Sequence, residues 1–291
     1  MTELKTIWLS AWVNFRKWTI NPRIYTLAAV IVAFSLWFFS WISDYAAAVG
    51  VKSSPWVFPF LLTMPVAFPI YGCLTILLFC DAPFTDSHTP YLAIRMSRRN
   101  WVLGQLLYIM LASFAYTVFF WLVSMLVLVP NVKFSSSWGP VLKTIAYDPG
   151  SAERLGITPM VLIDDPVISL FSPIPAVLIS LGLFWLVSVF VGVAIFCFNV
   201  VLGNMSGLIA AGLLTFLSYF SIYVGKIAFG QKIYYISPLN WGSMFYLDWG
   251  DSGLVPSPIF AVSVLVGTIV LMGFVSTVVF CRKDLHIRER R

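Results

Sequence analysis

The segment Cys80–Trp101 reads CDAPFTDSHTPYLAIRMSRRNW and separates two long apolar runs. It is polar, helix-prone and contains three arginines. Each flanking run is long enough to cross about 30 Å of hydrocarbon, which takes roughly 20 helical residues. A basic segment between two such runs is typical of a loop that joins two membrane spans. Its arginines have a simple explanation as topology signals, and a docking role is the alternative.

The chain as a whole is also strongly apolar. Of 291 residues, 60% are hydrophobic and 10% are charged, and the mean hydropathy is +0.91, whereas a soluble chain is about 45–50% apolar. We therefore predict an all-α polytopic membrane protein with a six-helix transmembrane domain over residues 23–281. The six predicted transmembrane helices are Ile24–Ser43, Trp56–Cys80, Trp101–Pro130, Pro173–Leu202, Met205–Gly225 and Pro258–Cys281.

An even number of spans places both termini on one side of the membrane. If that side is the cytoplasm, 12 of the 18 Lys and Arg residues are internal, and they cluster beside the span ends. This bias predicts cytoplasmic N and C termini. The loop 81–100 and the basic tail 282–291 then lie inside, and the loop 131–172 lies outside.

Before the first span, residues 1–22 have the pattern of an amphipathic helix. Leu4, Trp8 and Trp12 share one face, while Ser10 and Asn14 lie on the other. We expect an interfacial helix along the inner leaflet, with its polar face in water and its tryptophans at headgroup depth. A partly buried helix on the soluble side is the alternative.

Two further segments have distinctive composition. Pro59, Pro65 and Pro69 each remove a backbone donor from the second span, which should therefore be kinked and face protein. Residues 226–257 are too aromatic for a solvent loop and too rich in Gly and Pro for a straight span. We expect an outer re-entrant or interfacial hairpin there, and a small cap formed by the loop 131–172.

The sequence offers no catalytic constellation. It contains no GxxxxGK[ST], HExxH or GxSxG motif. His88 and His286 are far apart, so we expect no metal site, no catalytic residue and no cofactor in this chain. The interiors of the six predicted spans also contain no Asp, Glu, Lys or Arg. Ion-coupled carriers normally need such groups at membrane depth, so energy for transport would come from another subunit.

The order of an interfacial helix, a basic loop after the second span and an aromatic hairpin before the last span resembles type-2 ABC export permeases. DAPFTDSHTPYLAIRMSRRNWVLGQLLY resembles the corresponding loop of small permeases from low-GC Gram-positive bacteria, and ISPLNW resembles the outer segment of that family. The resemblance implies a multi-pass protein of the bacterial cell (plasma) membrane. It also implies two partners, a cytosolic ABC ATPase that carries ATP and Mg, and a second identical or related permease.

In that family, the loop between the second and third spans forms a coupling helix that docks on the ATPase, here Pro90–Ser97. The candidate ATPase contacts carried over are Asp86, Tyr91, Leu92, Arg95 and Arg98. The cargo pathway would run between the second and fifth spans. Its candidate residues are Phe60, Met64, Phe68, Tyr71, Phe216, Tyr219, Phe220 and Tyr223.

Uncharged aromatic walls suit an apolar or amphiphilic cargo such as a peptide, a lipid or a drug. The alternative is that these rings only pack or face membrane lipid. At the level of function, the alternatives are a stand-alone channel or ion-coupled carrier, and a membrane anchor or sensor subunit that transports nothing. We expect no interaction with nucleic acid.

Overall fold

The computed structural model describes residues 3–84, 97–163, 165–203, 205–250 and 252–282, and over these ranges the chain is helical. The only strand-like pairing in them is one bridge between Ser53 and Val132. Five helical segments are long and apolar enough to cross a membrane, which is the make-up of a multi-pass membrane protein. They are α2 (Pro22–Val49), α5 (Arg98–Leu126), α8 (Pro173–Leu202), the continuous segment Ser206–Phe229, and α11 (Pro258–Arg282).

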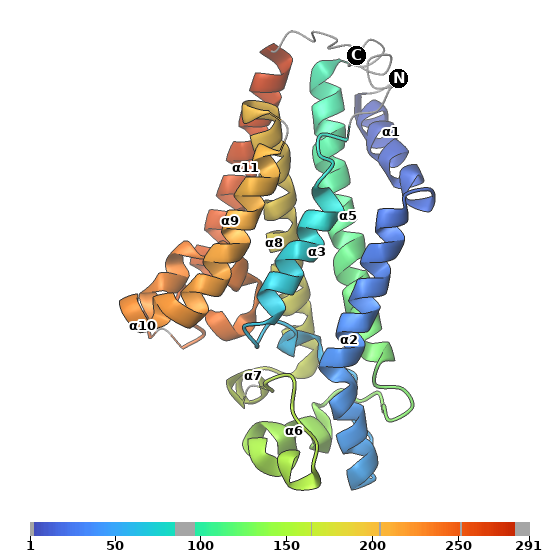
Figure 1. Cartoon of the computed structure of the whole chain (residues 1–291), viewed down its shortest axis with the longest axis vertical. Helices are drawn as coiled ribbons and strands as arrows, with labels where there is room; N and C mark the ends of the chain where they lie inside the picture. Colours follow the sequence, from blue (N-terminus) through green and yellow to red (C-terminus); the bar gives the residue numbers. More distant parts are fainter. Residues whose placement is uncertain (1–2, 85–96, 164, 204, 251, 283–291) are drawn as a thin grey trace.

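These long helices run side by side along the long axis of the molecule (Figure 1). The segment Ser206–Phe229 consists of α9 (Ser206–Phe220), a π turn (Ser221–Gly225) and α10 (Lys226–Phe229). Helix α8 contacts α5, α9 and α11, and most of it is buried. Because α8 is apolar on all sides, it can serve as the centre of the bundle, whereas α11 exposes most of its surface.

The uninterrupted span expected over Trp56–Cys80 is instead a short helix preceded by irregular backbone. Only α3 (Ala67–Phe79) is α-helical, and its 13 residues cover about 20 Å at 1.5 Å per residue. The 3₁₀ turn Phe58–Phe60 and the next three residues, 61–63, are buried. Pro59 and Pro65 cannot donate helical hydrogen bonds, which explains why the helix begins only after them. The hydroxyl of Thr63 donates to the carbonyl of Phe60 at 2.8 Å.

The N-terminal helix forms as predicted, but its orientation is different. Helix α1 (Glu3–Arg16) packs against α5 and buries Ser10 and Asn14, with 7% and 4% of their surface exposed. The expectation that these two residues face water is wrong. The reason lies at Gly104 in α5, where a Cβ atom would stand 2.5 Å from Ser10 Cβ, so glycine permits close contact with the small polar face.

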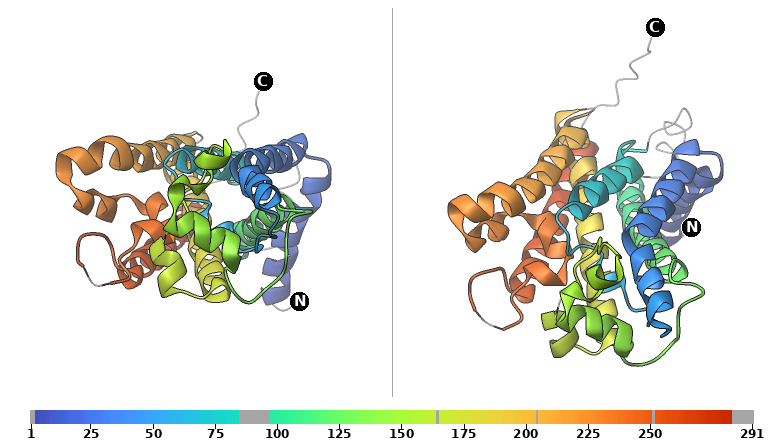
Figure 2. Two further views of the ribbon diagram at one scale, coloured as in Figure 1. Left: turned by 90° about the horizontal axis from the view of Figure 1, so that it is seen from below. Right: turned by 60° about the horizontal axis from the view of Figure 1, so that its bottom comes forward.

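At the other end of the bundle, the loop 131–172 folds into a small cap of short helices and turns. It contains α6 (Gly139–Tyr147), 3₁₀ turns at Pro149–Ser151 and Glu153–Leu155, and α7 (Asp165–Leu170). Seen from below, α6 and α7 lie across the end of α8 (Figure 2). The cap is fixed to the irregular backbone before α3, because Trp56 Nε1 donates to Ser135 O at 2.7 Å and Phe60 packs on Trp138.

The segment between α10 and α11 folds back into the bundle. It consists of three 3₁₀ turns, Gln231–Ile236, Pro238–Gly242 and Met244–Tyr246. Asn240 is fully buried; its side chain accepts a hydrogen bond from Ser218 Oγ and donates one to Ser221 Oγ at 2.9 Å. The turns around Asn240 are thus buried against the bundle, whereas Gln231, Ile236 and Leu254 of the same segment are exposed.

Candidate functional site

The candidate coupling residues belong to the loop that joins α3 to α5 in the sequence. The end of α3 and the start of α5 lie at the end of the bundle where α1 begins and α11 ends (Figure 1). Asp86, Tyr91, Leu92 and Arg95 lie outside the described residues, as does all of the expected helix Pro90–Ser97 except Ser97. Arg98 is the first residue of α5, and Ser97 caps that helix by accepting from the backbone N–H of Asn100 at 3.2 Å. The structure therefore describes the residues at both ends of the loop, and four attachments hold these ends to the helices.

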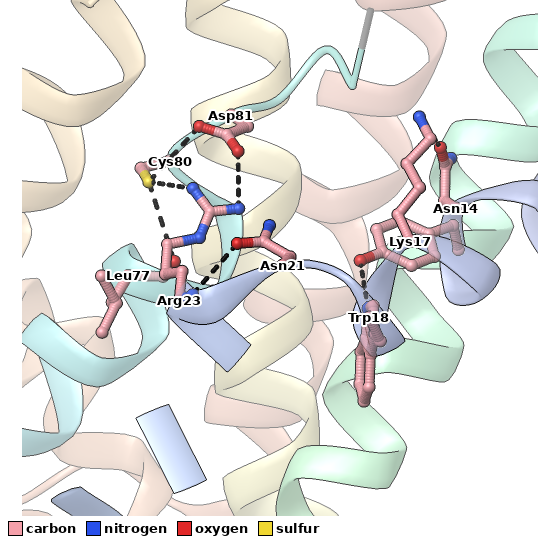
Figure 3. Close-up of polar contacts among 9 residues, drawn as sticks. Asn14, Lys17, Trp18, Asn21, Arg23, Leu77, Cys80 and Asp81 are labelled. Atoms are coloured by element: carbon pink, nitrogen blue, oxygen red, sulfur yellow. Dashed lines mark hydrogen bonds and ion pairs between the residues drawn. The ribbon is translucent and has the colours of Figure 1, made fainter. Parts of the chain in front are cut away.

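The first attachment joins the end of α3 to the start of α2. Arg23 forms an ion pair with Asp81 at 2.6 Å, and its guanidinium also donates to the sulfur of Cys80 at 2.8 Å (Figure 3). The Arg23 side chain is 18% exposed and that of Asp81 is 59% exposed. A half-exposed pair contributes only about 0–1 kcal/mol to stability. The Arg23–Asp81 pair matters more for geometry than for stability, because it fixes the direction in which the chain leaves α3.

The second attachment joins the N-terminal helix to α5. Asn14 Nδ2 donates to Gln105 Oε1 at 2.9 Å in a buried contact, and Trp18 Nε1 donates to the hydroxyl of Tyr108 at 2.8 Å. The ring of Tyr108 also contacts Phe84, the last described residue before the loop, with 4.7 Å between ring centres. Tyr108 therefore links the N-terminal segment to the base of the loop.

Between these two attachments lies a small polar cavity of about 180 Å³. Figure 3 shows several of its side chains, which come from three separate stretches of the sequence. The residues that line it are Asn14, Lys17, Trp18, Asn21, Arg23, Ile24, Asp81, Phe84 and Tyr108. Lys17 Nζ donates to Asn14 Oδ1 at 3.0 Å, so its charge is held at the rim of this cavity.

The third attachment is made by Asn199 near the end of α8. Its amide nitrogen donates to the carbonyl of Ala82 at 2.6 Å, and its amide oxygen accepts from the backbone N–H of Gly207 at 2.8 Å. Gly207 lies in the first turn of α9 and touches Ile195, where an added Cβ would stand 2.3 Å from the carbonyl oxygen. One buried amide thereby connects the turn after α3 to α8 and α9.

The fourth attachment joins the start of α5 to the end of α11. Arg98 donates to the carbonyl of Cys281 at 3.3 Å, and Trp101 stacks on Phe280 with 4.7 Å between ring centres. We refer to the four attachments together as the junction. Its hydrogen-bonding and ionic residues are Asn14, Trp18, Arg23, Asp81, Arg98, Gln105, Tyr108 and Asn199.

Sequence reasoning singled out only Arg98 from this set. Asn14 was placed in water, and the parts that Gln105 and Asn199 play were missed. The sequence does contain a signal for buried hydrogen bonds at these two positions. Gln105 and Asn199 are isolated amides within predicted apolar spans, where an unpaired polar group is costly. Their partners, however, are a side chain and backbone groups distant in sequence, which the pattern does not identify.

The candidate pathway residues before and in α3 lie inside the chain. Phe60, Phe68 and Tyr71 are at most 2% exposed, and Met64 is half-buried. Phe68 packs edge-on against Tyr246, and the hydroxyl of Tyr71 lies 2.9 Å from Ser188 Oγ. These residues therefore contribute to the core of the bundle in this conformation.

The candidate pathway residues near α9 lie on its outer side. Phe216, Tyr219 and Tyr223 are 43–64% exposed, and Phe220 is half-buried. Helices α3 and α9 do pack directly, since a Cβ on Gly72 would stand 2.4 Å from Thr215 Oγ1. The two aromatic sets nevertheless face different environments, so the structure of one chain does not bring them together.

Within the described ranges, no group of three His, Cys, Asp or Glu residues could hold a metal ion. No protein-family model, curated protein or solved structure matches the chain.

Proposed function

We propose that this chain is the transmembrane permease subunit of a type-2 ABC exporter in a bacterial plasma membrane. A separate cytosolic ATPase, which binds ATP and Mg, would energise it. In this proposal α3 and the backbone before it form the second of six passes, and both termini are cytoplasmic. The observation that carries the proposal is the junction, which ties the base of the loop 85–96 to all the long apolar helices.

The junction supports this function because it gives a docked partner a mechanical connection to the membrane helices. A displacement of the turn after α3 acts on α2 through Arg23 and on α8 and α9 through Asn199. A displacement of the start of α5 acts on α11 through Arg98 and on α1 through Gln105. Packed helices transmit such shifts because their interiors are dense and resist compression.

The exposed surface near α9 supports the class of cargo and the position of the second permease in this proposal. Phe216 and Tyr219 of α9 and Tyr223 of the π turn are exposed and form an uncharged aromatic face. Helix α9 itself lies on the side of the bundle away from α1 and α2 (Figure 2). In the assembled exporter, this face would meet a second permease across an apolar pathway. An apolar or amphiphilic cargo is then expected, because the long helices α2, α5, α8, α9 and α11 carry charged residues only near their ends.

The test is to isolate the chain in mild detergent, identify any bound ATPase with a Walker motif, and reconstitute the complex in vesicles. Tyr91→Ala with Leu92→Ala should abolish cargo-stimulated ATP hydrolysis at normal protein levels, because apolar anchors supply most docking energy. The conservative pair Arg95→Lys with Arg98→Lys retains charge and serves as the comparison.

If both pairs behave like the parent complex, the loop is a topology signal and the proposal loses its support. Flux that follows an ion gradient without ATP would instead establish a stand-alone carrier. If no cargo is transported, whether or not an ATPase is bound, the chain would be an anchor or sensor subunit.

A further inference from the structure

A large groove lies on the outside of the bundle, between α5, α8 and α11. Its volume is about 770 Å³, and it is partly open to the surroundings of the protein. Most of its wall is aliphatic or aromatic, with Leu106 and Met110 on one side and Val270 and Phe274 on the other. The residues lining this groove also include Arg99 and Arg282.

The two arginines lie at one end of the groove, which gives it a polarity. Arg99 is in the first turn of α5 and Arg282 is the last residue of α11, and both are exposed. Their helices are held together there by the bond from Arg98 to the carbonyl of Cys281. Among the described residues, ion pairs occur only at Arg23–Asp81 and Arg154–Asp148, so neither groove arginine has an acidic partner there.

The length of the apolar part matches one leaflet. From Arg99 to Met110, the α5 wall spans 11 helical steps, or about 16 Å at 1.5 Å per residue. Half of a hydrocarbon core about 30 Å thick is about 15 Å. A molecule with an anionic head between the arginines would therefore place its tails along the groove and end near the bilayer centre.

The floor of the groove is formed where a side chain is missing. Gly273 in α11 faces Leu106 of α5, and an added Cβ would stand 3.4 Å from Leu106 Cδ1. The glycine is thus not required for helix contact, but it leaves space that a larger residue would fill. Gly267, one and a half turns earlier on α11, lies in open space and outside the groove.

We propose that this groove binds one anionic phospholipid of the inner leaflet, with its phosphate between Arg99 and Arg282 and its acyl chains along α5 and α11. Basic pockets between membrane helices on the cytoplasmic side bind acidic headgroups because guanidinium groups form strong paired hydrogen bonds with phosphate. The assignment uses the orientation given under the proposed function, but it does not depend on transport or on an ATPase.

The test is native mass spectrometry of the full chain in detergent, titrated with phosphatidylglycerol or with phosphatidylcholine of the same acyl chains. The parent should bind one phosphatidylglycerol more tightly than phosphatidylcholine. Arg99→Gln with Arg282→Gln should reduce phosphatidylglycerol affinity about 10- to 30-fold, since each guanidinium contributes roughly fivefold. Binding of phosphatidylcholine should fall less, because its choline cancels the charge of its phosphate, so the preference for phosphatidylglycerol should be lost.

Two matched controls separate the groove from general effects. Lys5→Gln with Arg16→Gln removes the same charge from exposed positions on α1 and should leave both affinities within about twofold of the parent, because separated surface charges are screened. Gly273→Leu should weaken phosphatidylglycerol binding by filling the groove, whereas Gly267→Leu should not.

Equal affinity for the two lipids in the parent would overturn the proposal. So would an equal loss of preference in the α1 control pair, because the effect would then be one of net charge. If a second copy covered the groove, Gly273→Leu would dissociate a dimer in the same spectra without altering lipid preference, and that result would also overturn it.

Discussion

Single buried amides organise this molecule at two places. Asn199 joins three chain segments at the junction. Asn240 joins the 3₁₀ turns before α11 to Ser218 of α9 and to Ser221 of the π turn. In an apolar interior, a polar side chain is costly unless its hydrogen bonds are made. Both amides use their oxygen and their nitrogen, so each fixes the position of groups that apolar packing alone would leave free to slide.

Replacing Asn199 should therefore be disproportionately costly. Asn199→Ala leaves the carbonyl of Ala82 and the N–H of Gly207 without their described partner, at about 1–3 kcal/mol for each buried group. We expect a clear decrease in the free energy of unfolding, measured by thermal denaturation in detergent. Asn100→Ala, a half-exposed amide at the same end, is the control. Equal stability of the two variants would show that Asn199 does not hold the junction together.

Asp248 predicts a local dependence on pH. Although burial opposes its ionisation, hydrogen bonds from Ser252 and from the backbone of Gly250 and Gly253 outweigh that effect and lower its pKa from 3.8 to about 2. The carboxylate thus stabilises the loop before α11 above about pH 4, and this contribution is lost as the pH falls toward 2.

Hydrogen exchange of this loop should accordingly accelerate between pH 4 and pH 2, after correction for the intrinsic pH dependence of exchange. In Asp248→Asn the loop should already exchange faster at pH 7 and show no such transition. Asp165→Asn removes an exposed carboxylate from the cap and should leave the exchange of this loop as in the parent. A transition that survives in Asp248→Asn would assign it to another group.

At the scale of elements, the packing of α1 differs most from the sequence-based expectation. Its apolar face carries Trp8 and Trp12, which are 51% and 52% exposed, while its small polar face contacts α5. The amphipathic pattern correctly identified a helix, but it could not reveal which face meets protein. That choice depends on Gly104 and Gln105, which lie about ninety residues away and provide a close approach and a hydrogen-bond partner.

Enlarging Gly104 should separate α1 from α5. In a cysteine-free background, a cysteine at Ser10 should be unreactive toward a water-soluble maleimide, because this position is buried. Gly104→Leu should make it reactive, since even a Cβ would stand 2.5 Å from Ser10 Oγ. Gly182→Leu is the control, because this glycine of α8 has open space around it, and it should leave the cysteine at position 10 unreactive. Reactivity of Ser10→Cys in the parent would contradict this packing.

The predicted second span shows a different limit of sequence reasoning. Hydropathy identified the apolar run, and its prolines indicated a distortion, but a kink and a complete break have the same composition. The break depends on Phe58 and Phe60, which pack against Phe184 and Trp138 and so hold the irregular backbone in the core. These contacts join residues far apart in sequence, whereas the long uninterrupted helices could be predicted from the length of their apolar runs alone.

At the scale of the whole molecule, the arrangement predicts which positions share a side of the membrane. Lys5 on α1 and Lys143 on α6 are both exposed and lie at opposite ends of the bundle (Figure 1). Single cysteines at these positions should react with an impermeant maleimide from opposite sides, Lys5→Cys only in opened cells and Lys143→Cys in intact cells. Labelling of both from one side would exclude the proposed topology.

The π turn at Ser221–Gly225 has a consequence for comparing this chain with relatives of different length. Such a turn accommodates one residue more than an α-helical turn. Deleting one residue there would restore an unbroken α-helix, and the residues beyond it would keep their directions because the wide turn had absorbed the extra residue. Ile227 and Phe229, now 87% and 67% exposed, would then still face outward. The same deletion in a regular α-helix would rotate everything beyond it by about 100°. When homologous sequences are aligned, a single-residue gap in this region should therefore mark the loss of the π turn, with the surface of α10 unchanged.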